Sequence, residues 1–166
     1  MVDLRCGKGL GATMKLLRGA SWALKRVLLI LGLLVFYLYA HLWLLKPRRA
    51  STMRDLYEVF YMDFLALRPE DVEVVKLTDE ELVTVSRNPC PILKLAMTLK
   101  MDTRYVCKFI SETVCKHVLK HIDEGLVFER DYDHIRPYKD GCRERIYRRA
   151  IKQAMDLSSN LRGPAR

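Results

Sequence analysis

The sequence predicts an α+β fold, with one long apolar helix near the N-terminus followed by a small domain of helices and strands. Three observations lead to this prediction. A run without formal charge at neutral pH extends from Val27 to Leu45. Valine-rich segments of alternating polarity, typical of strands, recur later in the chain. Between them lie segments whose apolar residues repeat every three or four positions, as they do in amphipathic helices.

The apolar run has the length and the flanks of a membrane anchor. A helix from Val27 to Leu45 is about 28 Å long and nearly crosses the roughly 30 Å hydrocarbon core of a bilayer. Basic residues bound it and aromatic residues lie near its ends, as they do at membrane–water interfaces. The basic residues are Lys25, Arg26, Lys46, Arg48 and Arg49, and the aromatic residues are Trp22, Tyr37, Tyr39 and Trp43. We therefore expect a single-pass membrane protein.

A buried core helix and a cleaved signal peptide are the two alternatives for this run. A core helix usually keeps a polar stripe, and the segment from Val27 to Tyr39 has none. A signal peptide usually has a shorter basic leader, and it needs a small residue where Leu38 stands, two positions before Ala40. Both comparisons favour an uncleaved anchor.

We expect four parts in the chain: an N-terminal tail, the anchor, the domain and a C-terminal tail. Residues 1–26 contain several glycines among basic residues, which predicts a flexible basic tail rather than a stable helix. The anchor covers 27–45, the domain covers 50–155, and a flexible tail covers 156–166. The numbers of lysine and arginine residues before and after the anchor are nearly equal, so the orientation of the anchor in the membrane rests on a small difference. The dense cluster after the anchor, together with the absence of paired-cysteine spacing, favours a cytoplasmic domain.

The charge of the chain points to anionic partners. The formal net charge is +9, which attracts phosphate groups. For an anchored domain, anionic lipid headgroups are the simplest such partner. No recognition motif accompanies the basic C-terminal run, so nucleic acid is not expected. The oligomeric state does not follow from these features.

The periodicities place the domain elements in the order helix, two strands, two helices, two strands. Ser51 with Asp55 indicates the start of the first helix. Asp102 is expected to cap the long second helix of the adjacent pair, which ends around Gly125 and has Cys107 at the centre of its apolar side. The expected ranges are 56–67 (helix), 71–77 and 82–87 (strands), 92–99 and 103–122 (helices), and 126–135 and 142–151 (strands).

Cysteines are the first candidates for chemistry. Four of the five lie in the domain, at Cys90, Cys107, Cys115 and Cys142. Their spacing lacks the close pairs of a structural zinc site, which leaves buried free thiols or two disulfides as the alternatives.

A thiol nucleophile would need a base and an orienting carboxylate nearby. Cys107 or Cys142, with His121 or His134 and Asp133, would form such a set if the fold brings them together.

Two histidines form a candidate metal site. His117 and His121 stand four positions apart on an expected helix, so both rings can face one ion such as zinc. The pair lacks the glutamate that follows the first histidine in the H-E-x-x-H pattern. The alternative is a polar flank of the helix.

Four segments of the domain resemble a known family. They are TDEELVTVSRNPCPILKLA (78–96), DTRYVCK (102–108), LVFER (126–130) and DGCRE (140–144). Together they resemble the family named for L-2-amino-thiazoline-4-carboxylate hydrolase and, more distantly, the 4-vinyl-reductase ligand-binding domains, over about residues 72–147. The resemblance implies a small α+β domain and, in the named member, hydrolytic opening of a thiazoline ring. It also implies a shared site formed by the cysteines at 90, 107 and 142, with Cys115 and Arg130 as further candidates.

From these observations we expect a membrane-tethered domain that binds or senses an unknown small molecule. One alternative is a thiol- or metal-dependent hydrolase of a small sulfur heterocycle or amide, with Cys107, Cys142 and His121 as its catalytic residues. Another is a non-catalytic membrane assembly subunit.

Overall fold

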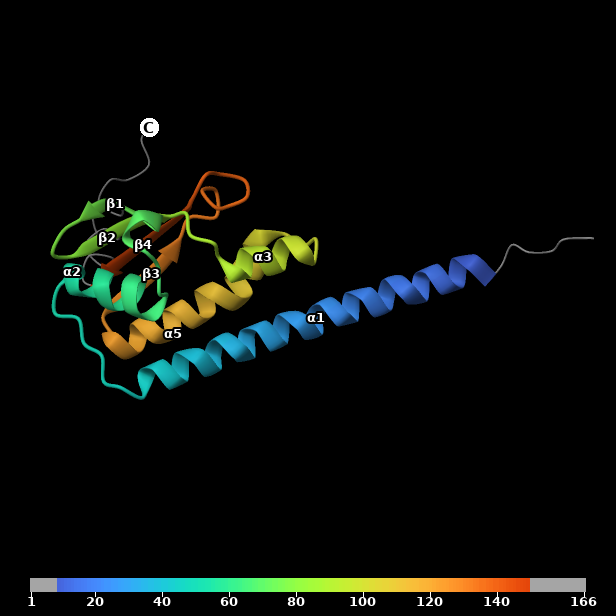
Figure 1. The fold of residues 1–166 in the computed structure, drawn as a ribbon, viewed down its shortest axis with the longest axis horizontal. Helices are drawn as coiled ribbons and strands as arrows, with labels where there is room; N and C mark the ends of the chain where they lie inside the picture. The colour runs from blue at the N-terminus through green and yellow to red at the C-terminus, as the bar shows by residue number, and fades with distance from the viewer. Residues whose placement is uncertain (1–8, 150–166) are drawn as a thin grey trace, which may run out of the picture.

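The computed structural model describes residues 9–149 and combines a long helix with a four-stranded antiparallel sheet (Figure 1). Helix α1 spans Gly9–Leu44 and lies on the same side of the sheet as the other helices, with α5 between it and the sheet. The predicted α+β fold and order of elements are confirmed.

Helix α1 begins much earlier than the expected anchor. Its 36 residues include most of the segment predicted to be a flexible tail, so that prediction is wrong for residues 9–26. Glycine disfavours a helix, but the leucine, alanine, methionine and lysine residues around the glycines are strong helix formers. They also extend a helix already nucleated by the apolar run. Within α1, the stretch Ser21–Leu44 is long and apolar enough to cross a membrane. The tail predicted at 156–166 lies outside the described residues.

The first domain helix follows a short connection. Helix α2 (Met53–Leu56) continues directly into a π-helical segment, η1 (Tyr57–Phe64). Thr52, rather than Ser51, is the N-cap: its hydroxyl accepts the Asp55 N–H, and the Asp55 carboxylate accepts the Thr52 N–H. This reciprocal capping box satisfies two backbone donors at the helix start.

The sheet is built from two antiparallel pairs. Strands β1 (Val72–Leu77) and β2 (Glu81–Ser86) form the predicted hairpin, preceded by the short 3₁₀ segment η2 (Pro69–Asp71). Strands β3 (Leu126–Arg130) and β4 (Cys142–Arg148) form the second pair. The order β1-β2-β4-β3 places β4 at the centre. Its register sets Cys142 opposite Ser86, and sets Glu144 between Thr84 and Arg130.

The helices between the two pairs cover one face of the sheet. Helix α3 (Pro91–Thr98) is followed by α4 (Thr103–Cys107), a π-helical segment η3 (Lys108–Glu112) and α5 (Thr113–Ile122). The last three form the continuous helix expected from the sequence. Asp102 caps it as predicted, because its carboxylate accepts the Arg104 N–H at 2.8 Å.

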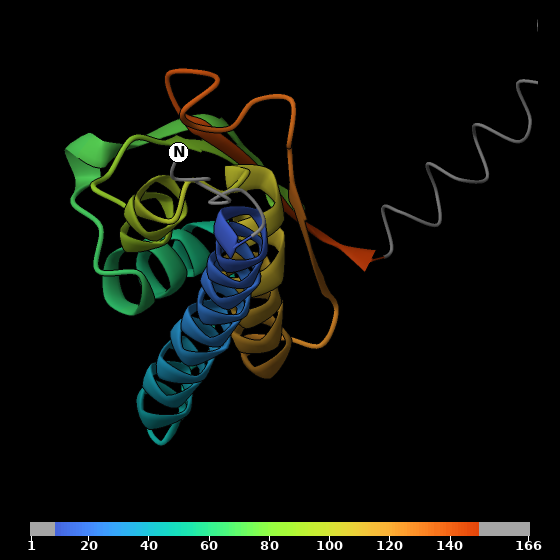
Figure 2. The same cartoon turned by 90° about the vertical axis from the view of Figure 1, so that its right-hand side faces the viewer.

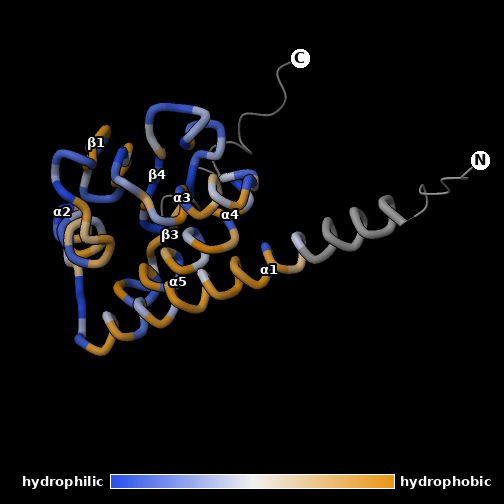
Figure 3. The backbone as a smooth tube through the Cα atoms, turned by 45° about the vertical axis from the view of Figure 1, so that its right-hand side comes forward, coloured by the Kyte–Doolittle hydropathy of each residue, from blue (hydrophilic) through white to orange (hydrophobic). Residues whose placement is uncertain are grey.

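The C-terminal part of helix α1 packs along the domain (Figure 2), while its N-terminal part extends beyond the domain (Figure 1). Its packed residues recur every three or four positions: Leu29, Leu33, Phe36, Tyr37, Ala40, Trp43 and Leu44. Gly32 lets the helices approach closely, since a Cβ there would lie 3.3 Å from side-chain carbons of Ile110 and Leu95. Figure 3 shows the hydrophobic character of α1 along the domain. The predicted anchor is therefore also a packing element of the fold.

Candidate functional site

A cavity of about 540 Å³ lies where α1 meets the domain. One wall is apolar: α1 contributes Gly32, Val35, Phe36 and Tyr39, and the end of η1 contributes Phe64. The facing wall carries polar groups from the sheet and from the loops at its edge. They are Ser86, Asn88, Arg130, Arg136 and Glu144. A mainly apolar hollow with a few convergent polar groups is the usual form of a small-molecule site.

Three of the four domain cysteines line this cavity. Cys90 precedes α3, Cys107 ends α4 and Cys142 begins β4, so positions far apart in the sequence meet at one place. Arg130 lines it with them. Cys115 does not: it is buried behind the wall, with its Sγ 3.9 Å from the Oγ of the lining residue Ser111. All four are free thiols.

A buried ion pair forms the polar floor of the cavity. The Arg130 and Glu144 side chains are 4% and 5% exposed, and Arg130 Nε and Nη2 lie 3.1 and 2.5 Å from Glu144 Oε1. Arg130 Nη1 also donates to Cys107 Sγ at 2.8 Å. The second Glu144 oxygen accepts a hydrogen bond from the Tyr61 hydroxyl at 3.0 Å, and Tyr61 accepts one from Thr84 at 2.7 Å. Glu144 is thus held in place by a hydrogen-bond network.

Arg136 was not among the residues singled out from the sequence. It lies in the turn-prone segment before β4, where local sequence indicates only a turn. Arg136 Nη1 and Nη2 donate to the Asn88 carbonyl and side-chain oxygens at 2.5 and 3.2 Å, and Nε lies 3.5 Å from Cys142 Sγ. The lining therefore holds two guanidinium groups and one carboxylate, which leaves one positive charge facing the cavity. This excess favours an anionic ligand group.

Two of the four domain thiols, Cys107 in the lining and Cys115 behind it, are poor nucleophiles. Burial raises the pKa of Cys107 to about 11, although the Arg130 guanidinium acts in the opposite direction. Burial likewise raises the pKa of Cys115 to about 12. Because the thiolate is the reactive form, both cysteines are inert at neutral pH.

The expected catalytic set of a thiol and a histidine is not assembled. All four histidines of the chain lie within residues 9–149, and none lines the cavity. His121 instead has its Nδ1 2.8 Å from the His117 carbonyl oxygen, and His134 pairs with Asp140 at 3.3 Å. Cys107 and Cys142 therefore share the cavity without the predicted base.

The two predicted metal ligands do lie together. The His117 and His121 ring centroids are 4.4 Å apart, and His41 of α1 approaches His117 to 5.0 Å. Within residues 9–149, however, no group of three or more histidine, cysteine or acidic side chains is arranged to hold a metal ion. The arrangement gives the zinc prediction no support and instead indicates a packing contact between α1 and α5.

This histidine contact predicts a pH-dependent stability. Burial lowers the pKa of His117, and His121 and His41 add to the effect, so the folded chain binds a proton less readily than the unfolded chain. The stabilisation is present above the unfolded pKa of about 6.5 and is lost as pH falls below it. Denaturation of the full chain in detergent should show a lower free energy of unfolding at pH 5.5 than at pH 7.5. His117→Phe should reduce this difference and His134→Gln should not; equal differences in both variants would exclude His117 as the cause.

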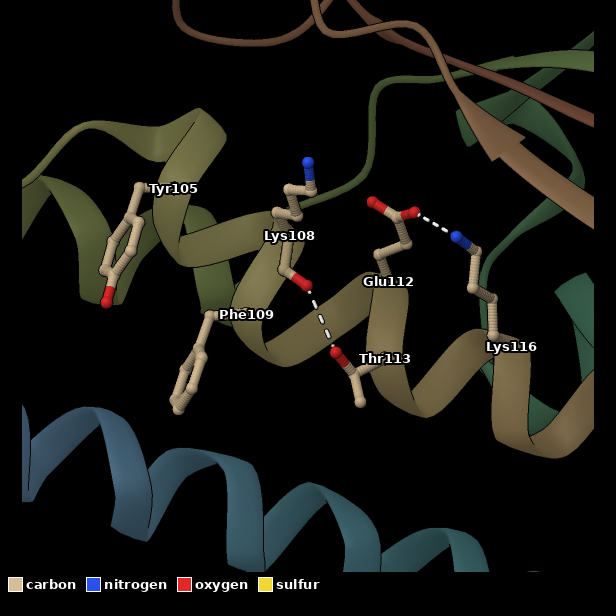
Figure 4. Close-up of a pocket in the computed structure, with 6 residues that line it drawn as sticks. All are labelled: Tyr105, Lys108, Phe109, Glu112, Thr113 and Lys116. Atoms are coloured by element: carbon tan, nitrogen blue, oxygen red, sulfur yellow. Dashed lines mark hydrogen bonds and ion pairs between the residues drawn. The ribbon is translucent and has the colours of Figure 1, made fainter.

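A second, shallower hollow of about 390 Å³ lies over η3 and the start of α5 (Figure 4). Its polar groups already satisfy one another: Lys116 pairs with Glu112, and the Thr113 hydroxyl donates to the Lys108 carbonyl at 3.1 Å. Tyr105 and Phe109 stack at one end of it, 6.3 Å apart. The cavity under α1 is the better candidate because charge and apolar surface converge there.

Comparison of the chain with known protein families, with curated proteins and with solved structures finds no match. The resemblance to the thiazoline-carboxylate hydrolase family thus stays a prediction. Any functional conclusion rests on the geometry of the site.

Proposed function

We propose that this chain is a membrane-tethered protein whose domain binds a small molecule with an apolar body and one anionic group. The cavity under α1 carries this proposal, because its apolar wall faces Arg130 and Arg136 with one unbalanced positive charge. Its volume of about 540 Å³ falls within the roughly 300–1,000 Å³ of small-molecule sites. A carboxylate is the simplest group to pair with a guanidinium.

Binding accounts for this site better than hydrolysis does. A thiol hydrolase requires an available thiolate and a base. Burial keeps the pKa of Cys107 near 11, and the carboxylate in the lining, Glu144, is engaged by Arg130 and Tyr61. These features favour a binding or sensory role over the hydrolase, and the cavity itself favours that role over a purely structural subunit.

We further propose that the domain faces the cytoplasm. Its four cysteines are unpaired, which is typical of a reducing compartment. The cytoplasmic leaflet is also the anionic one, which suits the basic residues that follow α1. The same charge would attract anionic lipid headgroups.

Ligand-dependent stability tests the proposed binding. A ligand that binds only the folded state raises the unfolding temperature. We expect 4-phenylbutyrate to raise the unfolding temperature of the full chain in detergent, and 4-phenylbutyramide, which lacks the charge, to raise it much less. Arg136→Gln should weaken the carboxylate effect about 10- to 100-fold in apparent affinity, because a hydrogen bond to a charged group contributes roughly 1.5–3 kcal/mol.

Arg143→Gln is the matched control. It removes the same charge from an exposed position next to Cys142 that does not line the cavity. This variant should keep the wild-type response to the carboxylate. Equal stabilisation by acid and amide, or an equal loss in both variants, would contradict the proposal.

A further inference from the structure

The face of α1 that points away from the domain is a continuous apolar stripe. Its large side chains are each half exposed or more: Val27, Ile30, Leu34, Leu38 and Leu42, and Leu45 is exposed just after the helix ends. At 1.5 Å per residue the stripe from Val27 to Leu42 is about 22 Å long. An uninterrupted apolar surface of this length is unusual on a soluble monomer and indicates a membrane or a partner.

The opposite face of the same helical segment is occupied by the domain. Leu29 and Ala40 are buried in that contact, and Leu44 packs on the same cluster as Ala40. The contact from Leu29 to Leu44 is about 22 Å long, most of the length that a membrane-spanning segment would need. If lipid covers the apolar stripe, lipid and the domain contact opposite faces of the same stretch of helix.

A spanning α1 is incompatible with this packing. If α1 crossed the bilayer with the domain docked, η3 and α5 would enter the hydrocarbon beside it. They would bring Glu112, Lys116 and Lys120 with them. Placing charged side chains at the bilayer centre is strongly unfavourable even on the mildest insertion scale.

We infer that α1 lies in the plane of the membrane interface, with its apolar stripe in the lipid and the domain standing on the surface. Interfacial helices bury one apolar face at the boundary of headgroups and acyl chains. Basic residues stand at both ends of the stripe: Arg26 stacks on the exposed Trp22 ring at 4.1 Å, and Lys46 and Arg49 follow the other end. With a net charge of +9, an anionic lipid surface is the partner that these ends fit.

This inference replaces the spanning geometry expected from the sequence. It rests on the proposed membrane attachment but not on ligand binding. The two can therefore fail separately, because the ligand test needs no bilayer.

Depth-dependent fluorescence quenching tests the inference. Single tryptophans replace Val27, Leu34 or Leu42 in a full chain that carries Trp22→Phe and Trp43→Phe. The chain is bound to vesicles of phosphatidylcholine and phosphatidylglycerol containing lipids brominated either near the headgroup or near the chain end. If α1 lies in the plane of the interface, the tryptophans at all three positions should lie at the same shallow depth in the bilayer. A variant with Trp22→Phe alone is the control, since Trp43 packs against Phe64 at 5.1 Å and should be quenched weakly.

Each other outcome overturns the inference in a recognisable way. In a spanning helix Leu34 lies about 11 Å along the axis from Val27, so a marked maximum of depth at position 34 would show that α1 crosses the bilayer. Absence of quenching at all three positions would show that another protein surface, such as a second copy of the chain, covers the stripe. That result would also remove the proposed membrane attachment. Equal depth together with no response to 4-phenylbutyrate would retain the membrane geometry and reject the ligand.

Discussion

Glu144→Ala is expected to lower the free energy of unfolding by about 3–5 kcal/mol, because it leaves the Arg130 guanidinium buried without its counter-ion. Arg130 is 4% exposed in the structure, so water can replace the lost carboxylate only in part. The substitution also removes the acceptor of the Tyr61 hydroxyl. Since small domains are stable by only about 5–15 kcal/mol, a large share of the chain should unfold near room temperature in mild denaturant.

Denaturant titration followed by circular dichroism in detergent measures this effect. Glu70→Ala is the control, because Glu70 forms an ion pair with Arg68 on the open surface. It should cause no measurable change. The double variant Arg130→Met with Glu144→Leu should recover most of the stability, as apolar replacements of buried ion pairs often do. A double variant as unstable as Glu144→Ala alone would show that packing, rather than the unpaired charge, causes the loss.

Local patterns predicted most of the secondary structure. The hairpin of β1 and β2 follows from two valine-rich runs close together, and the helix capped by Asp102 follows from its apolar periodicity. Both depend on neighbours in the sequence, which a single chain displays. Cys90, Cys107 and Cys142 were grouped by resemblance alone, and they line one cavity.

The polar half of the site depends on contacts distant in sequence. The Arg130–Glu144 pair exists because β4 enters the sheet between β2 and β3. No periodicity specifies that register. Arg136 reaches Asn88, 48 positions earlier, only after its loop has folded over the sheet edge. The sequence therefore pointed to Arg130 only through the resemblance, and it gave no sign that Glu144 and Arg136 line the same cavity.

Hydropathy also could not predict the packing of α1. A helix that is apolar on every face looks the same whether lipid or protein covers a given face. Leu29 and Leu34 are chemically identical, yet the first is buried by the domain and the second is exposed. Only the folded domain distinguishes them, and that distinction changes the expected membrane geometry.

Phe64→Ala is expected to detach α1 from the domain. The Phe64 ring stacks with Phe36 at 5.8 Å and Tyr39 at 5.5 Å, and it contacts Trp43 at 5.1 Å. Removing a buried phenylalanine costs about 3–5 kcal/mol, through lost apolar contact and the cavity left behind. Here that loss falls mainly on the junction of η1 with α1, and it also opens the wall of the candidate site.

Detachment should change the position of α1 in the bilayer as well as the stability. Once the domain no longer packs along α1, no charged helix has to follow the apolar run into the lipid, and spanning becomes possible. In vesicles, Phe64→Ala should therefore move a tryptophan at position 34 from shallow to deep, while a tryptophan at position 27 stays shallow.

Phe60→Ala is the matched control: Phe60 is equally buried and contacts Phe64 and Phe128, but its ring stacks on no ring of α1 within the described chain. It should lower stability by a similar amount and leave both depths unchanged. A shift in both variants, or in neither, would mean that docking of the domain does not hold α1 in the plane of the membrane.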